Sequence, residues 1–161
     1  MASTSPLKQG AARAVSTVDH FIAGRRVGGG ARTAPVYDPA SGAVTKELAL
    51  ADSQTVRAAV EAAHAAFPPW RAMQPLKRAR VLARFQRLLE ERKDEIAALI
   101  TGEHGKTLAD SLGEVQRGIE NIEYATCVPE LLKGEHSRNV GPGIDSWSEL
   151  QPLGVCAGIT P

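Results

Sequence analysis

The chain has 161 residues, a formal net charge of +1 at pH 7, and no run of 18 apolar residues. This length favours about one domain. The charge balance gives no field that attracts nucleic acid or an anionic membrane, and no segment is apolar enough to cross a bilayer. Leu, Ile, Val and Phe account for 36 residues, 22% of the chain, close to the roughly 20% below which independent folding becomes doubtful. We therefore expect this chain to bury its apolar faces against another domain, another subunit or further sequence.

Residues 1–18 are interpreted as a disordered tail. They contain no apolar stretch typical of a secretion signal, and two cysteines in the whole chain are too few for a disulfide framework. Lys8, Arg13, several Ser and Thr and the absence of an acid before Asp19 are weakly typical of a transit peptide. We expect a cytoplasmic protein, with the mitochondrial matrix as the alternative.

The next segment, up to residue 50, predicts a small antiparallel β element. Short strands at 20–22 and 25–27 flank Ala23-Gly24, which suits a two-residue turn. The glycines at 28–30 indicate a loop. A further turn at 38–42 precedes a strand at about 43–50.

Three amphipathic helices follow, and the predicted buried face of the first contains Val56, Val60, Ala63 and Phe67. Asp52 or Ser53 caps the first, which Pro68-Pro69 should stop near Phe67. The second should run from Pro75 to about residue 100, and the third from a Thr107 cap to about residue 127. The apolar seam of the third helix contains Leu108, Leu112, Val115, Ile119 and Ile122.

Charge is distributed unevenly over these helices. Residues 71–93 carry a net +6 and residues 94–161 a net −7, which indicates charge complementarity within the fold or between subunits. The second helix carries a basic stripe, but no aromatic residues interleave with it, so we expect no nucleic-acid partner. The basic residues of the stripe are Lys77, Arg80, Arg84 and Arg87.

The last segment lacks the helical pattern of the residues before it. Residues 136–151 are interpreted as a linker or oligomerisation strand, with a turn at 141–143. Residues 153–159 form a short continuous apolar run, typical of a strand buried on both faces in a parallel sheet. Such a strand needs neighbours on both sides, so we expect the chain to stop inside a domain.

Several motifs resemble those of NAD(P)-dependent aldehyde dehydrogenases. They are YDPASG at 37–42, EHGK at 103–106 and QPLGVCAGITP at 151–161. Two others, GEVQRGIE at 113–120 and LLKGE at 131–135, are more similar to the branch of the family that acts on methylmalonate semialdehyde and acylates CoA. The resemblance covers about residues 19–161.

This resemblance implies an α/β fold seen in part: a small antiparallel β element, three helices, and the first strand of a doubly wound nucleotide-binding sheet. The expected divisions are a tail at 1–18, a β/helical part at 19–135, a linker or oligomerisation strand at 136–151, and the first nucleotide-binding strand at 152–161. The family's nucleophilic Cys and general-base Glu lie later in its sequence, so we expect no catalytic residue here and an inactive fragment. A full-length relative is expected to be a homotetramer.

Arg117 is the sharpest candidate binding residue. Helical spacing places it off the apolar seam, free to face a cavity or solvent. The resemblance implies that it pairs with the substrate's carboxylate, whereas spacing alone favours a surface arginine bonded to Glu114 or Glu120. By the same resemblance, Ile159, Thr160 and Pro161 border the cofactor with their backbone, unless they are only the end of a strand.

The implied reaction is NAD-dependent oxidation of a (methyl)malonate semialdehyde through a Cys thioester that CoA takes, giving propionyl-CoA or acetyl-CoA. NADP in place of NAD stays open. The alternatives are a branch that does not use CoA and a non-catalytic helical interaction module. The four histidines lack ligand spacing, so no metal is expected. Cys127 and Cys156 are interpreted as small packed side chains rather than nucleophiles.

Overall fold

The computed structural model describes residues 15–160 and has an α/β architecture, as the sequence predicts. The strands are β1 (Ser16–Val18), β2 (His20–Ile22), β3 (Arg25–Val27), β4 (Thr33–Tyr37), β5 (Val44–Ala49), β6 (His136–Gly141) and β7 (Ile144–Trp147). The helices are α1 (Ser53–Ala72), α2 (Pro75–Glu91), α3 (Lys93–His104), α4 (Leu108–Ala125) and α5 (Val128–Leu131).

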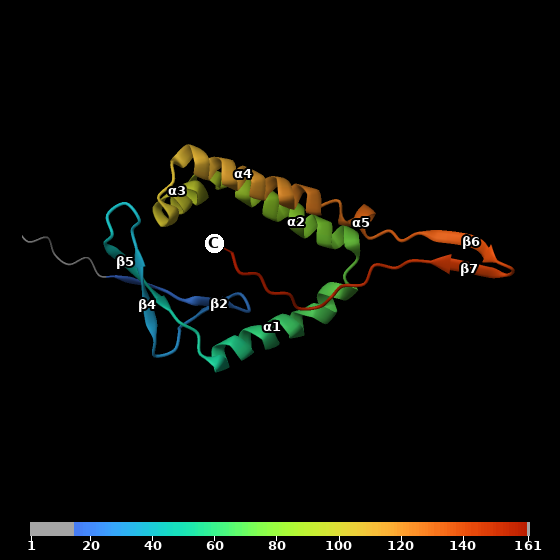
Figure 1. The fold of residues 1–161 in the computed structure, drawn as a ribbon, viewed down its shortest axis with the longest axis horizontal. Helices are drawn as coiled ribbons and strands as arrows, with labels where there is room; N and C mark the ends of the chain where they lie inside the picture. Colours follow the sequence, from blue (N-terminus) through green and yellow to red (C-terminus); the bar gives the residue numbers. More distant parts are fainter. Residues whose placement is uncertain (1–14, 161) are drawn as a thin grey trace, which may run out of the picture.

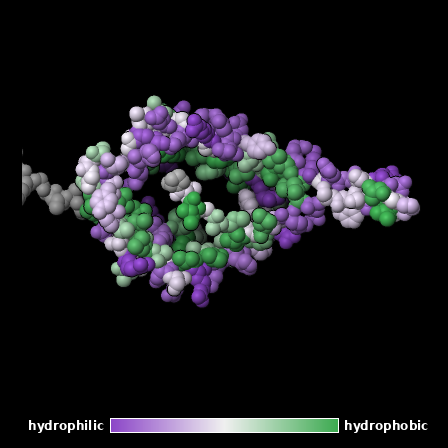
Figure 2. Space-filling view, viewed as in Figure 1, coloured by the Kyte–Doolittle hydropathy of each residue, from purple (hydrophilic) through white to green (hydrophobic). Residues whose placement is uncertain are grey.

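The elements enclose a central opening. In Figure 1, the N-terminal strands and α1 form one side, the helices α2, α3 and α4 form the other, and the β6–β7 hairpin projects away from both. Figure 2 shows apolar side chains gathered around the inner rim of the opening, while polar side chains dominate the outside. The apolar faces are therefore turned toward a space that the described residues do not fill.

The hairpin of β2 and β3 forms as its turn chemistry predicts. The two strands are antiparallel, with His20 opposite Val27. Ala23 and Gly24 both have positive φ, 50° and 76°, which a two-residue turn with the right-handed twist of a hairpin requires.

The N-terminal sheet is mixed rather than purely antiparallel, and its first strand lies inside the segment predicted to be disordered. The strand order is β1-β5-β4: β1 runs parallel to β5, and β4 runs antiparallel to it. Residues 1–14 lie outside the described range, but residues 16–18 belong to a strand, so the boundary at residue 18 was wrong. Pairing with a strand some thirty residues away orders this segment, and tail composition carries no sign of such a partner.

Helix α1 begins at the predicted cap and continues past its predicted stop. The Asp52 carboxylate accepts a hydrogen bond from the Thr55 backbone N–H at 2.7 Å, which holds the pKa of that carboxyl below its usual value. Pro68 and Pro69 lie inside the helix, which ends only at Ala72. Proline's φ suits a helix, so the backbone can continue for a last turn without the two missing N–H donors.

The single helix predicted over 75–100 is two helices. Arg92, with φ −114° and ψ 16°, ends α2 and begins α3, and its guanidinium donates to both Glu95 carboxylate oxygens at 2.7 and 2.8 Å. No Gly or Pro marks the break. The change of direction lets α4 pack against both α2 and α3.

A small core lies between these helices. Its buried residues are Ala97, Val115 and Ile119, with Leu89, Ile96, Ile100 and Leu112 packed against them. Ser111 is fully buried, and its hydroxyl lies 2.9 Å from that of Thr101, so a polar group in the core is satisfied. The predicted seam of the third helix is thus confirmed at Leu112, Val115 and Ile119, whereas Leu108 is exposed.

The strand predicted at 153–159 is not formed. Residues 148–160 have no regular secondary structure, and Leu153 and Ile159 are almost fully exposed. A strand exists only through hydrogen bonds to a neighbour, and no described segment pairs with this one. Cys156, in this segment, and Cys127, after α4, are both exposed, so their interpretation as packed side chains was wrong.

The cap of α4 can be tested in isolation. A peptide of residues 105–127 carrying Thr107→Ala should lose helix stability by about 1 kcal/mol, because the Asp110 N–H loses its acceptor. Circular dichroism at 222 nm measures this loss. Thr107→Ser keeps the hydroxyl and should retain most of the helix; equal loss in both peptides would show that the cap contributes little.

Candidate functional site

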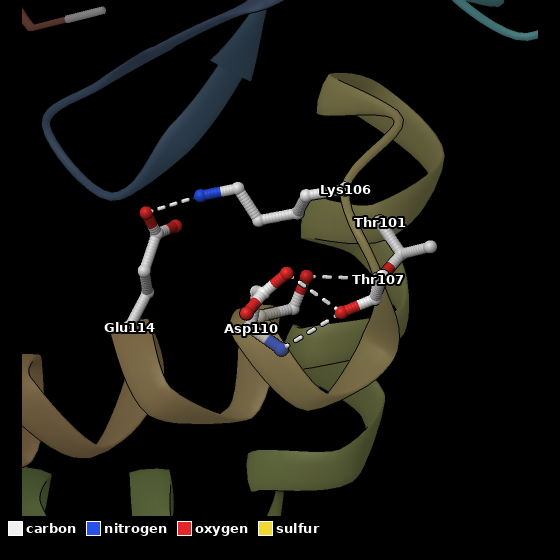
Figure 3. Close-up of polar contacts among 6 residues, drawn as sticks. Thr101, Lys106, Thr107, Asp110 and Glu114 are labelled. Carbon is white, nitrogen blue, oxygen red and sulfur yellow. Dashed lines mark hydrogen bonds and ion pairs between the residues drawn. The ribbon is translucent and has the colours of Figure 1, made fainter.

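The loop between α3 and α4 is held at both ends by local geometry. Gly105 ends α3 with φ 83°, a conformation that favours glycine, and a Cβ there would lie 3.0 Å from Pro39 Cγ. Thr107 caps α4: its hydroxyl accepts from the Asp110 N–H at 3.2 Å and donates to the Asp110 carboxylate at 2.7 Å (Figure 3). Lys106 is thereby fixed between two anchored residues.

Lys106 forms an ion pair with Glu114, one helical turn further along α4 than Asp110 (Figure 3). The lysine side chain is 18% exposed and the glutamate side chain 45%. The hydrogen bond from Lys106 holds the pKa of the Glu114 carboxyl below its usual value, and the Arg117 charge adds to this more weakly. Glu114 is therefore an anion at neutral pH and already has its partner.

Arg117 lies where its spacing predicts, exposed and off the core seam. It borders an open depression of ≈ 370 Å³. The lining residues are Lys106, Ala109, Asp110, Gly113, Glu114 and Arg117. The depression therefore gathers two cations and two carboxylates, so its formal charges balance.

The two glutamates that could bind Arg117 have other partners. Glu114 pairs with Lys106, and Glu120 accepts a hydrogen bond from Gln116 Nε2 at 3.1 Å. Among residues 15–160, the Arg117 guanidinium takes part in none of the ion pairs or side-chain hydrogen bonds. The simple surface-arginine interpretation, an i±3 pair, is therefore not what the structure shows.

The predicted cofactor-bordering residues lie elsewhere. Ile159 and Thr160 are exposed, and neither lines the Arg117 depression. The C-terminal segment as a whole runs into the central opening in Figure 1. Pro161 lies outside the described residues. The structure thus does not bring the two predicted groups together.

One contact of the last segment was not predicted from the sequence. Gly154, Val155 and Cys156 lie across α1 and border a space of ≈ 310 Å³. The α1 residues that line it are Ala63, Ala66, Phe67 and Trp70. The apolar face predicted for the first helix could have indicated this contact, because an apolar helix face needs another segment to cover it.

Two general features bear on function. The described part of the chain contains no group of three or more His, Cys, Asp or Glu side chains that could hold a metal ion. Within the same residues, no helix is both long enough and apolar enough to cross a membrane.

Comparisons with known proteins agree on one family. Residues 27–161 match the aldehyde dehydrogenase family. The malonate-semialdehyde dehydrogenase of Pseudomonas aeruginosa is 54% identical over 147 residues, which cover 91% of this chain and 30% of that protein. The chain therefore spans about a third of the length of this relative.

Solved structures have the same fold over the same part. A methylmalonate-semialdehyde dehydrogenase from Oceanimonas doudoroffii is 57% identical with a TM-score of 0.83, covering 86% of this chain and 28% of that one. A protein from Sinorhizobium meliloti 1021, assigned as a methylmalonate-semialdehyde dehydrogenase and solved in complex with NAD, is 42% identical with a TM-score of 0.88. That match covers 95% of this chain and 31% of the other.

Proposed function

The chain belongs to the aldehyde dehydrogenase family, and we propose that it forms the N-terminal part of an NAD-dependent enzyme that oxidises malonate or methylmalonate semialdehyde. The similar proteins named above carry these two substrates in their names. The observation that carries the proposal is the guanidinium of Arg117, which lies beside an open depression without an ion-pair partner among the described residues. Both substrates carry a carboxylate one carbon away from the reacting aldehyde.

In this proposal, Arg117 orients the substrate. A planar, permanently charged guanidinium can bind a carboxylate through two parallel hydrogen bonds. Such a contact fixes one end of a short semialdehyde, so that the aldehyde end has a defined direction. The nucleophile and the general base would come from the part of the enzyme beyond these residues, and the isolated chain would be inactive.

The cofactor of the proposed enzyme is NAD. Ile159 and Thr160 fit a backbone contact with it, because both are exposed and neither takes part in a backbone hydrogen bond within the described range. NAD supplies the acceptor for the hydride that leaves the substrate. The S. meliloti protein, solved in complex with NAD, supports NAD over NADP.

CoA is proposed as the acyl acceptor. The support is the similarity of residues 113–120 and 131–135 to the CoA-acylating branch. The product of this chemistry would be a thioester of CoA, propionyl-CoA or acetyl-CoA after loss of the carboxylate.

A homotetramer is the proposed assembly. The β6–β7 hairpin projects from the rest of the chain in Figure 1, and Val140, Ile144 and Trp147 on it are 60%, 57% and 72% exposed. Apolar side chains on a projecting two-stranded element need covering, and a second copy of the enzyme would supply it.

The full-length enzyme can be assayed with malonate semialdehyde and with propanal, with and without CoA. We expect NADH formation, followed at 340 nm, with kcat/KM at least about tenfold higher for the carboxylated aldehyde, and stoichiometric consumption of CoA. Equal efficiency with propanal would contradict carboxylate recognition. Turnover to the free acid without CoA would instead support a non-acylating branch.

A further inference from the structure

The Lys106–Glu114 ion pair lies directly beside Arg117. Glu114 precedes Arg117 by three positions on α4, a spacing at which opposite charges pair on a helix. An unpaired Glu114 would therefore compete with any bound carboxylate for the Arg117 guanidinium. In the structure, Glu114 turns to Lys106 instead, and all three residues line the same depression.

The surrounding structure stabilises the Lys106–Glu114 ion pair. Lys106 is anchored by Gly105 in the left-handed conformation and by the Thr107 cap. Its side chain is mostly shielded from solvent, at 18% exposure, and shielding weakens the screening that makes fully exposed pairs ineffective. The pKa of the Glu114 carboxyl is lowered as a consequence of this hydrogen bond from Lys106.

The other acidic residues near Arg117 also have hydrogen-bond partners. The Asp110 carboxylate accepts a hydrogen bond from the Thr107 hydroxyl at 2.7 Å. Glu120 accepts from Gln116 Nε2 at 3.1 Å. Glu114 is thus the acid whose release would change the state of Arg117 most, because it alone shares both the helix spacing and the depression with it.

We propose that Lys106 is a positioning residue that holds Glu114 away from Arg117 and so keeps the guanidinium available to the substrate's carboxylate. This inference rests on the proposed function and adds to it a residue that acts on the substrate only through Glu114. Loss of Lys106 therefore affects substrate binding only because Glu114 is present.

The test is a double-mutant cycle in the full-length enzyme. Lys106→Met should raise KM for malonate semialdehyde by about two- to fivefold, the range that partly exposed ion pairs support, with kcat and KM for propanal nearly unchanged. Glu114→Gln alone should change KM little, because that carboxylate is already paired. The double variant Lys106→Met/Glu114→Gln should return KM to near the wild-type value.

Other outcomes overturn the inference. Additive changes in KM, with the double variant as impaired as Lys106→Met, would mean that Lys106 acts on the substrate directly and not through Glu114. Lys106→Arg, which can also hold Glu114, should stay near wild type. Failure of both Lys106→Met and Lys106→Gln to fold would assign Lys106 a structural role and equally refute the proposal.

Lys46→Met provides the matched control. It breaks the Lys46–Glu103 pair, a second Lys–Glu contact, which joins β5 to α3 and shares no residue with the Arg117 depression. It should leave KM for both aldehydes unchanged. Arg117→Ala in the same assay distinguishes failure of the proposed function from failure of the role proposed for Lys106. If it affects both aldehydes equally, the proposed function fails; if it is selective but the cycle is additive, only the role of Lys106 fails.

Discussion

Replacing Arg117 by alanine in the full-length enzyme is expected to raise KM for malonate semialdehyde by roughly 10- to 150-fold. This range corresponds to the loss of one hydrogen-bonded charge pair, about 1.5–3 kcal/mol. KM for propanal should stay within about twofold, because propanal has no carboxylate to lose a partner. Steady-state kinetics with both aldehydes measure the difference.

Two further variants test whether the effect on KM is specific to the guanidinium of Arg117. Arg117→Lys keeps the charge but not the planar fork, so it should recover only part of the affinity for the carboxylated substrate. Arg84→Ala removes an exposed arginine from α2, outside the Arg117 depression, and should leave both KM values unchanged. An equal rise in KM for both aldehydes in Arg117→Ala would refute carboxylate recognition.

The features predicted correctly are those that short-range chemistry determines. The Ala23-Gly24 turn, the Asp52 and Thr107 caps and the exposed place of Arg117 each depend on a few neighbouring residues or on helical spacing. The similarity of the motifs at 113–120 and 151–161 to one family pointed to the same family that the comparisons show.

The features predicted wrongly depend on partners distant in the sequence. Strand β1 forms because β5 offers an edge, and the break at Arg92 follows from packing of two helices on α4. The apolar run at 153–159 stays unpaired because strand propensity without a neighbour gives no hydrogen bonds. The Lys106–Glu114 pair joins a loop to a helix across eight residues, and its role was not apparent from spacing.

The isolated 161-residue chain is expected to unfold without a sharp cooperative transition. Its accessible surface is 13306 Å², whereas a compact monomer of 17.1 kDa should expose only about 7,700 Å². The fifteen residues outside the described range would account for about 2,300 Å² even if they were fully unfolded. A large excess therefore remains on the described residues.

Many large apolar side chains contribute to this exposed surface. Helix α1 buries none of its residues, and Val56 and Val60 on its predicted core face are 53% and 52% exposed. Figure 2 shows such side chains continuing around the inner rim. Hydrophobic stabilisation scales with buried area, at about 25 cal/mol per Å². A ring of elements whose inner apolar face stays in water therefore gains little hydrophobic free energy to offset the entropy cost of ordering the chain.

The measurements are thermal melting by circular dichroism, binding of the dye ANS, and sedimentation of the purified chain. We expect a broad transition and strong dye binding, as in states that keep secondary structure without fixed packing. In the proposed full-length enzyme we expect the rim to be covered, so that protein should melt sharply and bind little dye. A compact, sharply melting 161-residue monomer would contradict the prediction and favour an independent helical module, because a chain that folds alone must bury its own apolar faces.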